Sequence, residues 1–366
     1  MKKVLWLTNI PSPYRVSFFN ELGRDCELTV LFEKAFSEER DDRWKEYECR
    51  NFTGIVLPSK SVDVDKAISF SAFRYLWKYR REIIVISNPA SPTGILAITF
   101  MRMLGIPYVI ESDGAFPKKS TGLKGLLKRF LYVKSKACFT TSELGKEYFL
   151  LNGVPHQNIF KYPFTSIHDN DIPDAIGTKQ KELLRKQLHI EEPRVVISVG
   201  RFIKSKGFDV LLEAVSRIND KTIGFYIVGD KPTEEFLSYC NEKKLSNVHF
   251  VDFMLPTKLR EWYLAADVFT LPTRTDVWGL VINEAMSCGL PVVTTNMCIA
   301  GTEMVSENNG ILINIDDSKA LANGILSVLN NVEKEAMSKN ARDVASEYTI
   351  EKMAQKHIQL FNEIYE

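Results

Sequence analysis

Short runs of apolar residues recur along the chain and alternate with longer stretches in which apolar residues repeat with a helical period. Uninterrupted apolar strands that alternate with helices indicate parallel sheets covered by helices on both faces. The pattern therefore predicts an α/β protein with two doubly wound parallel sheets. The runs lie at residues 4–8, 28–32, 83–87, 108–112, 137–141, 195–199, 223–228, 248–252, 268–272, 291–295 and 310–314.

A polar segment separates the first five runs from the other six. Residues 166–193 read SIHDNDIPDAIGTKQKELLRKQLHIEEP, which is first acidic and then basic and contains one amphipathic helical stretch. A chain of 366 residues is also long for a single core and suits two domains. We therefore expect an N-terminal Rossmann-like domain over residues 1–168 and a C-terminal one over residues 169–349, with a deep ligand cleft between them.

The composition excludes several classes of protein. Apolar residues make up 45% of the chain, charged residues 25%, and the formal net charge is +1, which is typical of a globular protein without a nucleic-acid partner. The longest apolar stretch, residues 94–110, is interrupted by Arg102, Gly105 and Pro107 before it reaches the roughly 20 residues of a membrane span. Residues 1–8 lack a signal-peptide cleavage site, so we expect a cytoplasmic protein.

Cysteine and histidine spacing predicts neither disulfides nor a metal site. The 6 cysteines are widely spaced without a CxxC pair, so free thiols in a reducing compartment are expected. The 5 histidines form no HxxxH or HxH pair, so we expect no bound metal.

The loop after the run at 195–199 carries two cations that could bind an anion. It reads GRFIKSKG, in which Arg201 and Lys206 lie between a strand and a helix. Arg offers a planar fork of donors and Lys a compact charge, so together they favour an anion with several oxygens. Basic residues that only face solvent are the alternative.

Two carboxylates flank a glycine at a predicted helix start in TLPTRTDVWGLVINEAMSC, residues 270–288. Asp276 precedes Gly279 and Leu280, where the first N–H groups of the helix are unpaired and can bind phosphate. Gly279 has no side chain to block a ligand. Glu284 follows within two turns, and its carboxylate could accept two ribose hydroxyls. The alternative is a helix, a glycine cap and a buried strand with no ligand.

Together these residues resemble the retaining glycosyltransferases of family 4, which have the GT-B fold of two Rossmann-like domains. The family's acidic residue, seven intervening residues and Glu read here as Asp276, VWGLVIN and Glu284, and its GRxxxxKG loop reads GRFIKSKG. The first acidic residue of the family is usually Glu, so Asp276 departs from it by one carbon. The resemblance is strongest over residues 195–315 and includes the stretch EAMSCGLPVV.

The resemblance implies a nucleotide-sugar donor in the C-terminal domain and an acceptor in the N-terminal domain, with a C-terminal helix at about residues 350–366 packed back on the latter. Arg201 and Lys206 would bind the diphosphate beside the helix start at Gly279 and Leu280. Glu284 would bind the ribose and Asp276 the transferred sugar. The implied reaction retains anomeric configuration and needs no metal or other cofactor. UDP is the expected nucleotide, and a hexose or N-acetylhexosamine the expected sugar.

The N-terminal half resembles enzymes that build bacterial O-antigens and capsules, through the loop NIPSPYRVSFFNEL at residues 9–22. Tyr14 and Arg15 open a helix there and could touch the acceptor or the donor diphosphate, unless Arg15 only faces solvent. Many relatives place a His six residues after the proline of the fourth strand, and counting from Pro107 gives Asp113. Either Asp113 or Glu111 could therefore position a sugar, although Glu111 could instead form only a strand-end salt bridge.

A basic amphipathic helix is predicted near residues 122–134. Its leucines and Phe130 alternate with lysines and Arg129, a pattern that can lie on an anionic lipid surface. The acceptor implied by the resemblance is a polyprenyl-diphosphate-linked saccharide, so we expect a peripheral protein on the cytoplasmic face of the inner membrane. An ordinary helix packed on the sheet is the alternative.

Other functions fit the sequence less well. A dinucleotide oxidoreductase would carry GxGxxG after the first strand, whereas NIPSPY contains no glycine. A sugar-nucleotide epimerase shares the two-domain fold but does not need the carboxylates at 276 and 284. A catalytically silent carbohydrate- or nucleotide-sugar-binding module would not need Arg201, Lys206 and Glu284 intact. Within the family, the short chain and the PSPYRVSFF loop favour surface-polysaccharide assembly over glycogen or sucrose synthesis.

Overall fold

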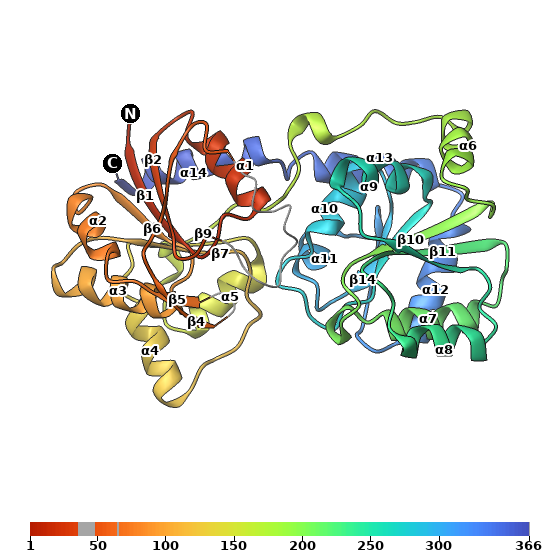
Figure 1. Ribbon diagram of the computed structural model, residues 1–366, viewed down its shortest axis with the longest axis horizontal. Coiled ribbons are helices and arrows are strands. Elements are labelled where there is room, and N and C mark those ends of the chain that lie inside the picture. The colour runs from red at the N-terminus through yellow and green to blue at the C-terminus, as the bar shows by residue number, and fades with distance from the viewer. Residues whose placement is uncertain (36–47, 64–65, 366) are drawn as a thin grey trace. The chain divides into compact units, whose positions relative to one another are not determined.

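The protein consists of two compact α/β units in the computed structural model, which describes residues 1–35, 48–63 and 66–365. Unit 1 comprises Met1–Ser166 and Thr349–Glu366, and unit 2 comprises Ile167–Tyr348 (Figure 1). Each unit contains a sheet of parallel strands, and each apolar run of the sequence forms one of these strands.

The sheet of unit 1 is centred on β1, Lys3–Thr8, which pairs in parallel with β2, Glu27–Phe32, and β6, Ile83–Ile86. All four apolar residues of β1 are completely buried because helices cover both faces of the sheet. The order is β3-β2-β1-β6-β7-β8-β9. The remaining strands of this unit are β3 Thr53–Val56, β7 Val109–Ser112, β8 Ala137–Thr140, β9 Ile159–Lys161 and the antiparallel pair β4 Lys60–Asp63 and β5 Lys66–Ile68.

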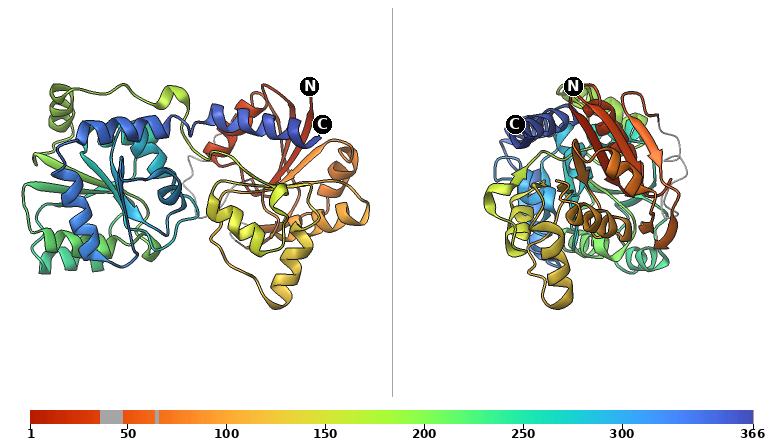
Figure 2. Two further views of the ribbon diagram at one scale, coloured as in Figure 1. Left: turned by 180° about the vertical axis from the view of Figure 1, so that it is seen from behind. Right: turned by 90° about the vertical axis from the view of Figure 1, so that its left-hand side faces the viewer.

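One face of this sheet is covered by the first and the last helix of the chain. Figure 2 shows α14, Ile350–Tyr365, running beside α1, Pro13–Leu22. His357 and Phe361 of α14 are completely buried against Trp6 of β1 and Phe18 of α1. The C-terminal segment is therefore part of the core of unit 1.

The opposite face carries the other helices of unit 1. Residues such as Leu76, Ile98 and Phe149 of these helices pack on Leu5 and Ile84 of the sheet. The helices are α2 Ala72–Lys78, α3 Pro92–Met103, α4 Gly122–Tyr132 and α5 Glu143–Leu151.

The sheet of unit 2 has the order β12-β11-β10-β13-β14-β15, so its strand order reverses between β10 and β13. Ligands of doubly wound sheets bind at such a switch point, beyond the carboxyl ends of the strands. The strands are β10 Arg194–Val199, β11 Ile223–Gly229, β12 Val248–Asp252, β13 Val268–Leu271, β14 Val292–Thr295 and β15 Gly310–Ile313. The helices are α6 Thr178–Gln187, α7 Phe208–Ile218, α8 Glu234–Glu242, α9 Pro256–Ala265, α10 Leu280–Ser287, α11 Ile299–Met304, α12 Ser318–Leu329 and α13 Lys334–Ala345.

Candidate active site

In unit 2, the loops after β10 and β13 meet because these two strands are neighbours in the sheet. The hydroxyl of Thr273 and the backbone N–H of Arg274 both donate to the carbonyl oxygen of Ser205, each over 2.7 Å. These bonds fix the first loop against the second. Lys206 lies in the first loop and Asp276 in the second.

The structure brings Lys206 and Asp276 into direct contact. The Lys206 Nζ lies 2.5 Å from Asp276 Oδ2, and the side chains are only 19% and 15% exposed. The other carboxylate oxygen of Asp276 accepts the N–H of Trp278 at 3.4 Å. Arg201, the second cation predicted from the sequence, is exposed at the start of the first loop. The cation predicted for the diphosphate is thus paired with the carboxylate predicted for the transferred sugar.

Two glycines are required to build this arrangement. Gly207 ends the first loop at φ 70°, and a Cβ there would lie 2.0 Å from the carbonyl oxygen of Pro272. Gly279 precedes α10 at φ 98°, and a Cβ there would lie 2.6 Å from the Sγ of Cys298. Both the left-handed conformation and the close packing therefore demand glycine. The helix predicted after Gly279 is α10, which begins at Leu280.

Glu284 is partly exposed on α10, and one of its oxygens is held by a tyrosine. The Tyr263 hydroxyl of α9 donates to Glu284 Oε2 over 3.1 Å. Tyr263 is buried, and burial together with the Glu284 charge raises the pKa of its phenol. Nothing in the local sequence pattern identified Tyr263, because its contact with α10 arises only when α9 packs beside it.

Arg274, which the sequence analysis did not assign, connects three loops of unit 2. Its guanidinium lies 2.6 Å from Asp209 Oδ2 and 2.6 Å from Asp316 Oδ1. Since Asp209 lies in the first turn of α7 and Asp316 follows β15, this one side chain joins the loops around the switch point. Arg274 is therefore a structural residue of the site and is already paired with two carboxylates.

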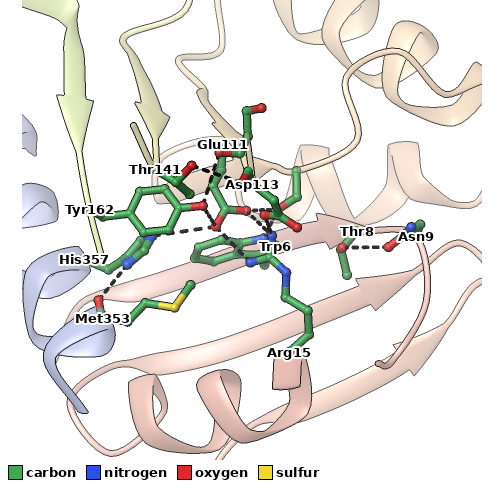
Figure 3. Close-up of polar contacts among 12 residues, drawn as sticks. Trp6, Thr8, Asn9, Arg15, Glu111, Asp113, Thr141, Tyr162, Met353 and His357 are labelled. Carbon is green, nitrogen blue, oxygen red and sulfur yellow. Dashed lines mark hydrogen bonds and ion pairs between the residues drawn. The ribbon is translucent and has the colours of Figure 1, made fainter. Parts of the chain in front are cut away.

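In unit 1, Arg15 is the centre of a buried ionic network at the end of β7 (Figure 3). Its Nη1 lies 2.8 Å from Glu111 Oε1, its Nη2 donates to Glu111 Oε2 over 3.0 Å, and the same nitrogen pairs with Asp113. Arg15 is 3% exposed and Glu111 is completely buried. Glu111 also accepts hydroxyl bonds from Tyr162, over 2.9 Å, and from Ser87, over 2.5 Å.

The two carboxyl groups that share Arg15 have opposite pKa shifts. Burial alone would raise the pKa of Glu111, but the charge and hydrogen bonds of Arg15 outweigh it and hold the pKa below its usual value. Burial raises the pKa of Asp113 to about 6, against the effect of Arg15 and with the help of the Glu111 charge. Since 31% of the Asp113 side chain is exposed, solvent moderates this rise. Glu111 is thus the permanent anion of the pair.

His357 of α14 completes the buried surroundings of Glu111. Its Nδ1 donates to the carbonyl oxygen of Met353 over 2.8 Å, and its Nε2 lies 3.8 Å from Glu111 Oε1. Burial lowers the pKa of His357 to about 4, so the ring is neutral at pH 7. A carbonyl only accepts hydrogen bonds, which places the single ring proton on Nδ1. The C-terminal helix therefore contacts the network without adding a charge.

The four residues predicted in unit 1 differ in their exposure and in their contacts. Asp113 retains exposed surface, whereas Glu111 lies in the interior and has the salt bridge that was its alternative interpretation. Arg15 does not face solvent: its side chain is buried, and its guanidinium is paired with the carboxylates of Glu111 and Asp113. Tyr14 is partly exposed, and its ring packs edge-on against Phe164 at 5.7 Å. Of these side chains, Asp113 is best placed to meet a ligand.

Asp113 lines a pocket of about 380 Å³ within unit 1. Ser87 and Asp113 lie at its polar wall, and Lys118 and Lys128 contribute cations. Lys128 is half-buried, with its Nζ 4.8 Å from the centre of the Tyr148 ring. The pocket therefore combines a carboxylate with positive charge, as a ligand with both sugar and phosphate groups would require.

The basic helix predicted near residues 122–134 is α4, and most of its apolar side chains face solvent. Leu123 is 85% exposed and Leu126 is 66% exposed, whereas Leu131 is buried against the sheet. Lys124 and Arg129 are also exposed. The outer face of α4 is thus both apolar and basic.

Three observations concern the described part of the chain as a whole. None of its helices combines the length and the apolar character that crossing a membrane requires. Its residues 1–35, 48–63 and 66–365 contain no group of three or more His, Cys, Asp and Glu side chains placed to hold a metal ion. The 6 cysteines are free thiols.

Comparison with known proteins relates this chain to glycosyltransferases. The family described as Glycosyl transferases group 1 matches residues 179–344. A UDP-Gal:alpha-D-GlcNAc-diphosphoundecaprenol alpha-1,3-galactosyltransferase of Escherichia coli is 25% identical over 320 residues, which cover 81% of this chain and 76% of that protein. An N,N'-diacetylbacillosaminyl-diphospho-undecaprenol alpha-1,3-N-acetylgalactosaminyltransferase of Campylobacter jejuni is 23% identical over 329 residues, or 85% of each chain.

Solved structures share the fold over nearly the whole chain. The crystal structure of Anabaena HepE in complex with UDP has a TM-score of 0.78 and 16% sequence identity, and the match covers 99% of this chain and 100% of that one. This likeness confirms the predicted GT-B class of two Rossmann-like units.

Proposed function

We propose that the protein, whose residues 179–344 match the family described as Glycosyl transferases group 1, is a retaining glycosyltransferase that makes a bacterial surface polysaccharide. It transfers a hexose or N-acetylhexosamine from a UDP-sugar to a polyprenyl-diphosphate-linked saccharide. The observation that carries the proposal is the arrangement of Lys206, Asp276 and Glu284 around the start of α10. The names of the Escherichia coli and Campylobacter jejuni relatives, with their diphosphoundecaprenol acceptors, support this acceptor class.

Unit 2 holds the donor in this proposal. Arg201, Lys206 and the backbone N–H groups at Gly279 and Leu280 bind the diphosphate, because cations and a helix start stabilise negative charge. Glu284 accepts the ribose hydroxyls. Positive side chains thus neutralise the departing diphosphate, and the reaction needs no metal.

Asp276 accepts hydroxyls of the transferred sugar from its position beside Gly279. The acceptor hydroxyl attacks the anomeric carbon on the face that the diphosphate leaves, through an oxocarbenium-like transition state, and the configuration is retained. The bond between the anomeric carbon and the diphosphate oxygen breaks as the new glycosidic bond forms, and the departing phosphate oxygen takes the hydroxyl proton. No side chain is required as a nucleophile in this reaction, so the protein's contribution is to position and to stabilise charge.

Unit 1 holds the acceptor. Asp113 positions a sugar hydroxyl in the pocket, and Lys118 and Lys128 attract the diphosphate of the lipid carrier. The exposed apolar and basic face of α4 lies on the anionic cytoplasmic leaflet of the inner membrane, where this carrier is anchored. The protein then acts as a peripheral enzyme on its membrane-bound acceptor.

A transfer assay tests the proposal. Purified protein is incubated with UDP-glucose, UDP-galactose, their N-acetylamino forms and GDP-mannose, together with a short-chain prenyl-diphosphate-linked N-acetylglucosamine. We expect transfer from one UDP-sugar, with the anomeric configuration of the donor retained in the product as measured by NMR. Inverted configuration would contradict the mechanism, and binding without turnover of any donor would support a silent binding module instead.

The acceptor pocket has its own variant in the same assay. Changing Lys128 to Met keeps the length of the side chain but removes its charge. KM for the acceptor should rise about tenfold or more, which corresponds to the loss of one charge-assisted contact, while hydrolysis of the UDP-sugar in the absence of acceptor stays unchanged. The exposed Lys339 of α13, changed to Met, is the matched control.

A further inference from the structure

The ion pair between Lys206 and Asp276 occupies the place where the proposed donor binds. Its two side chains are only 19% and 15% exposed, and its atoms lie 2.5 Å apart. Asp276 is fixed from several sides, because its N–H donates to the carbonyl oxygen of Met297 over 2.9 Å and its carboxylate accepts from the N–H of Trp278. A diphosphate that approaches Lys206 therefore meets a carboxylate that cannot easily move away.

In this geometry a nucleotide diphosphate and a nucleotide sugar differ in the hydrogen-bond donors that they offer to Asp276 when they bind. Both bring negative phosphate oxygens to Lys206, and both would draw its ammonium from Asp276. The carboxylate left behind is poorly solvated and lies close to the bound phosphates, so it needs other hydrogen-bond donors. The hydroxyls of a transferred sugar are such donors, whereas a free nucleotide diphosphate has none at this position.

On the basis of the function proposed above, we infer that the Lys206–Asp276 pair discriminates between the intact nucleotide-sugar donor and the nucleotide diphosphate product. When the donor binds, Lys206 changes its partner from Asp276 to the diphosphate, and Asp276 changes its partner from Lys206 to the sugar hydroxyls. After transfer the sugar has left, Asp276 faces the diphosphate with the N–H of Trp278 but without the sugar hydroxyls as donors, and the ion pair re-forms as the product leaves. Asp276 thus determines specificity by weakening product binding as well as by contacting the sugar.

Lys206 and Asp276 are suited to this exchange. An ammonium is a compact charge with three donors on a flexible stem, so Lys206 can redirect its bonds without leaving the site. A carboxylate is an acceptor only, and it therefore interacts favourably with hydroxyls and unfavourably with phosphate oxygens. Arg274, a cation of the second loop, cannot replace Lys206, because Asp209 and Asp316 already hold its guanidinium.

Calorimetry with UDP and thermal stabilisation by UDP-sugars test the inference in wild type and in Asp276→Asn. The amide keeps the shape of the side chain but removes its charge. We expect the variant to bind UDP about tenfold more tightly than wild type, while its affinity for the best UDP-sugar of the transfer assay rises by less than about twofold or falls. The preference for the intact donor over UDP should therefore decrease about tenfold.

Asp343→Asn is the matched control, because it removes one carboxylate charge from an exposed residue of α13 in the same unit, which is paired with Lys339 instead of Lys206. Its affinity for UDP should stay within about twofold of wild type. Asp276→Ser is a second variant in case the amide disturbs the loop, and unfolding of each variant without ligand shows whether it is folded. The Ser variant should show the same gain in UDP affinity.

Three outcomes overturn the inference alone. If Asp276→Asn and Asp276→Ser bind UDP no more tightly than wild type, Asp276 does not weaken product binding. If UDP and the UDP-sugar gain affinity equally, or if Asp343→Asn behaves like Asp276→Asn, the effect is a general one of net charge and there is no discrimination. In these cases the wild type still binds UDP and the proposed function stands, whereas a wild type that binds neither UDP nor GDP overturns both.

Discussion

Glu284 is the residue at which the proposed donor site can be tested most directly. Glu284→Gln keeps the shape of the side chain but removes the charge that strengthens hydrogen bonds to ribose hydroxyls, each worth about 1.5 to 3 kcal/mol. UDP affinity measured by calorimetry should fall roughly 10 to 150 fold. The exposed Glu307, changed to Gln, is the control and should bind UDP like wild type. If Glu284→Gln also binds UDP normally, this carboxylate does not contact the ribose.

Glu33 should make the stability of the protein depend on pH. Its side chain is completely buried after β2, one carboxyl oxygen accepts from the Ser91 hydroxyl over 2.6 Å, and burial raises its pKa from 4.5 to about 7. The folded protein therefore holds this proton more tightly than the unfolded chain does. The resulting stability is fully present below about pH 4.5 and is lost as pH rises through about 7.

Glu33→Gln removes this titration and provides the measurement. Between about pH 5 and pH 8, the free energy of unfolding of wild type should fall relative to that of the variant by up to about 3 kcal/mol. Urea denaturation of both proteins at the two pH values gives the difference. Parallel pH dependence of wild type and variant would show that Glu33 titrates normally in the folded protein.

Individual residues of the site differed in how far the sequence could predict them. Asp276 and Glu284 were recognised because their spacing is local, and a loop and one helix fix their positions. The pairing of Arg15 with Glu111 joins residues 96 positions apart in the chain, and no local pattern contains such a contact. The roles of Tyr263 and Arg274 were missed for the same reason, since each depends on elements that become neighbours only in the folded sheet.

Among the helices and strands, α4 has an exposed apolar and basic surface that predicts binding to an anionic membrane. Changing Lys124 and Arg129 to Glu reverses the charge of the outer face of α4. Each removed basic residue should weaken the free energy of membrane binding by about 1 kcal/mol. The variant should therefore no longer sediment with vesicles that contain anionic lipid. Lys128 is left unchanged because it lines the pocket. Hydrolysis of the UDP-sugar should not change.

A control with the same change in net charge separates the helix from the whole protein. Lys319 and Lys339 are exposed in unit 2 and can both be changed to Glu. This variant should sediment with vesicles like wild type. Equal binding by the α4 variant and wild type would mean that the basic face of α4 only contacts water.

The strands that the sequence did not predict share one property. β3 is largely exposed at the edge of its sheet, β9 has only three residues, and β4 and β5 form a separate short pair. None of them contains the continuous apolar run that marks a strand buried on both faces. In unit 1 the central strands were predictable because burial selects their residues, whereas its edge strands β3 and β9 depend on a neighbouring strand that offers hydrogen bonds. The edge strands β12 and β15 of unit 2 were predicted because each of them contains an apolar run.

For the whole molecule, the proposed chemistry predicts that transfer does not depend on a divalent metal. In the proposed mechanism, Arg201, Lys206 and the start of α10 supply the positive charge that stabilises the leaving diphosphate. The rate of sugar transfer in excess EDTA should equal the rate without chelator. Activity that disappears with EDTA and returns with Mn²⁺ would contradict this mechanism.

The path of the chain between the units also has a consequence for how the protein is made. Unit 2 is inserted within the sequence of unit 1, because the chain leaves unit 1 after Ser166 and returns at Thr349. During translation every residue of unit 2 is made before α14, so unit 2 can complete its core while the ribosome is still adding residues. Unit 1 must wait for His357 and Phe361 to cover Trp6 and Phe18. The half of the protein that is synthesised first is therefore the last to finish folding, and its aromatic residues are the surface that a chaperone would meet on the nascent chain.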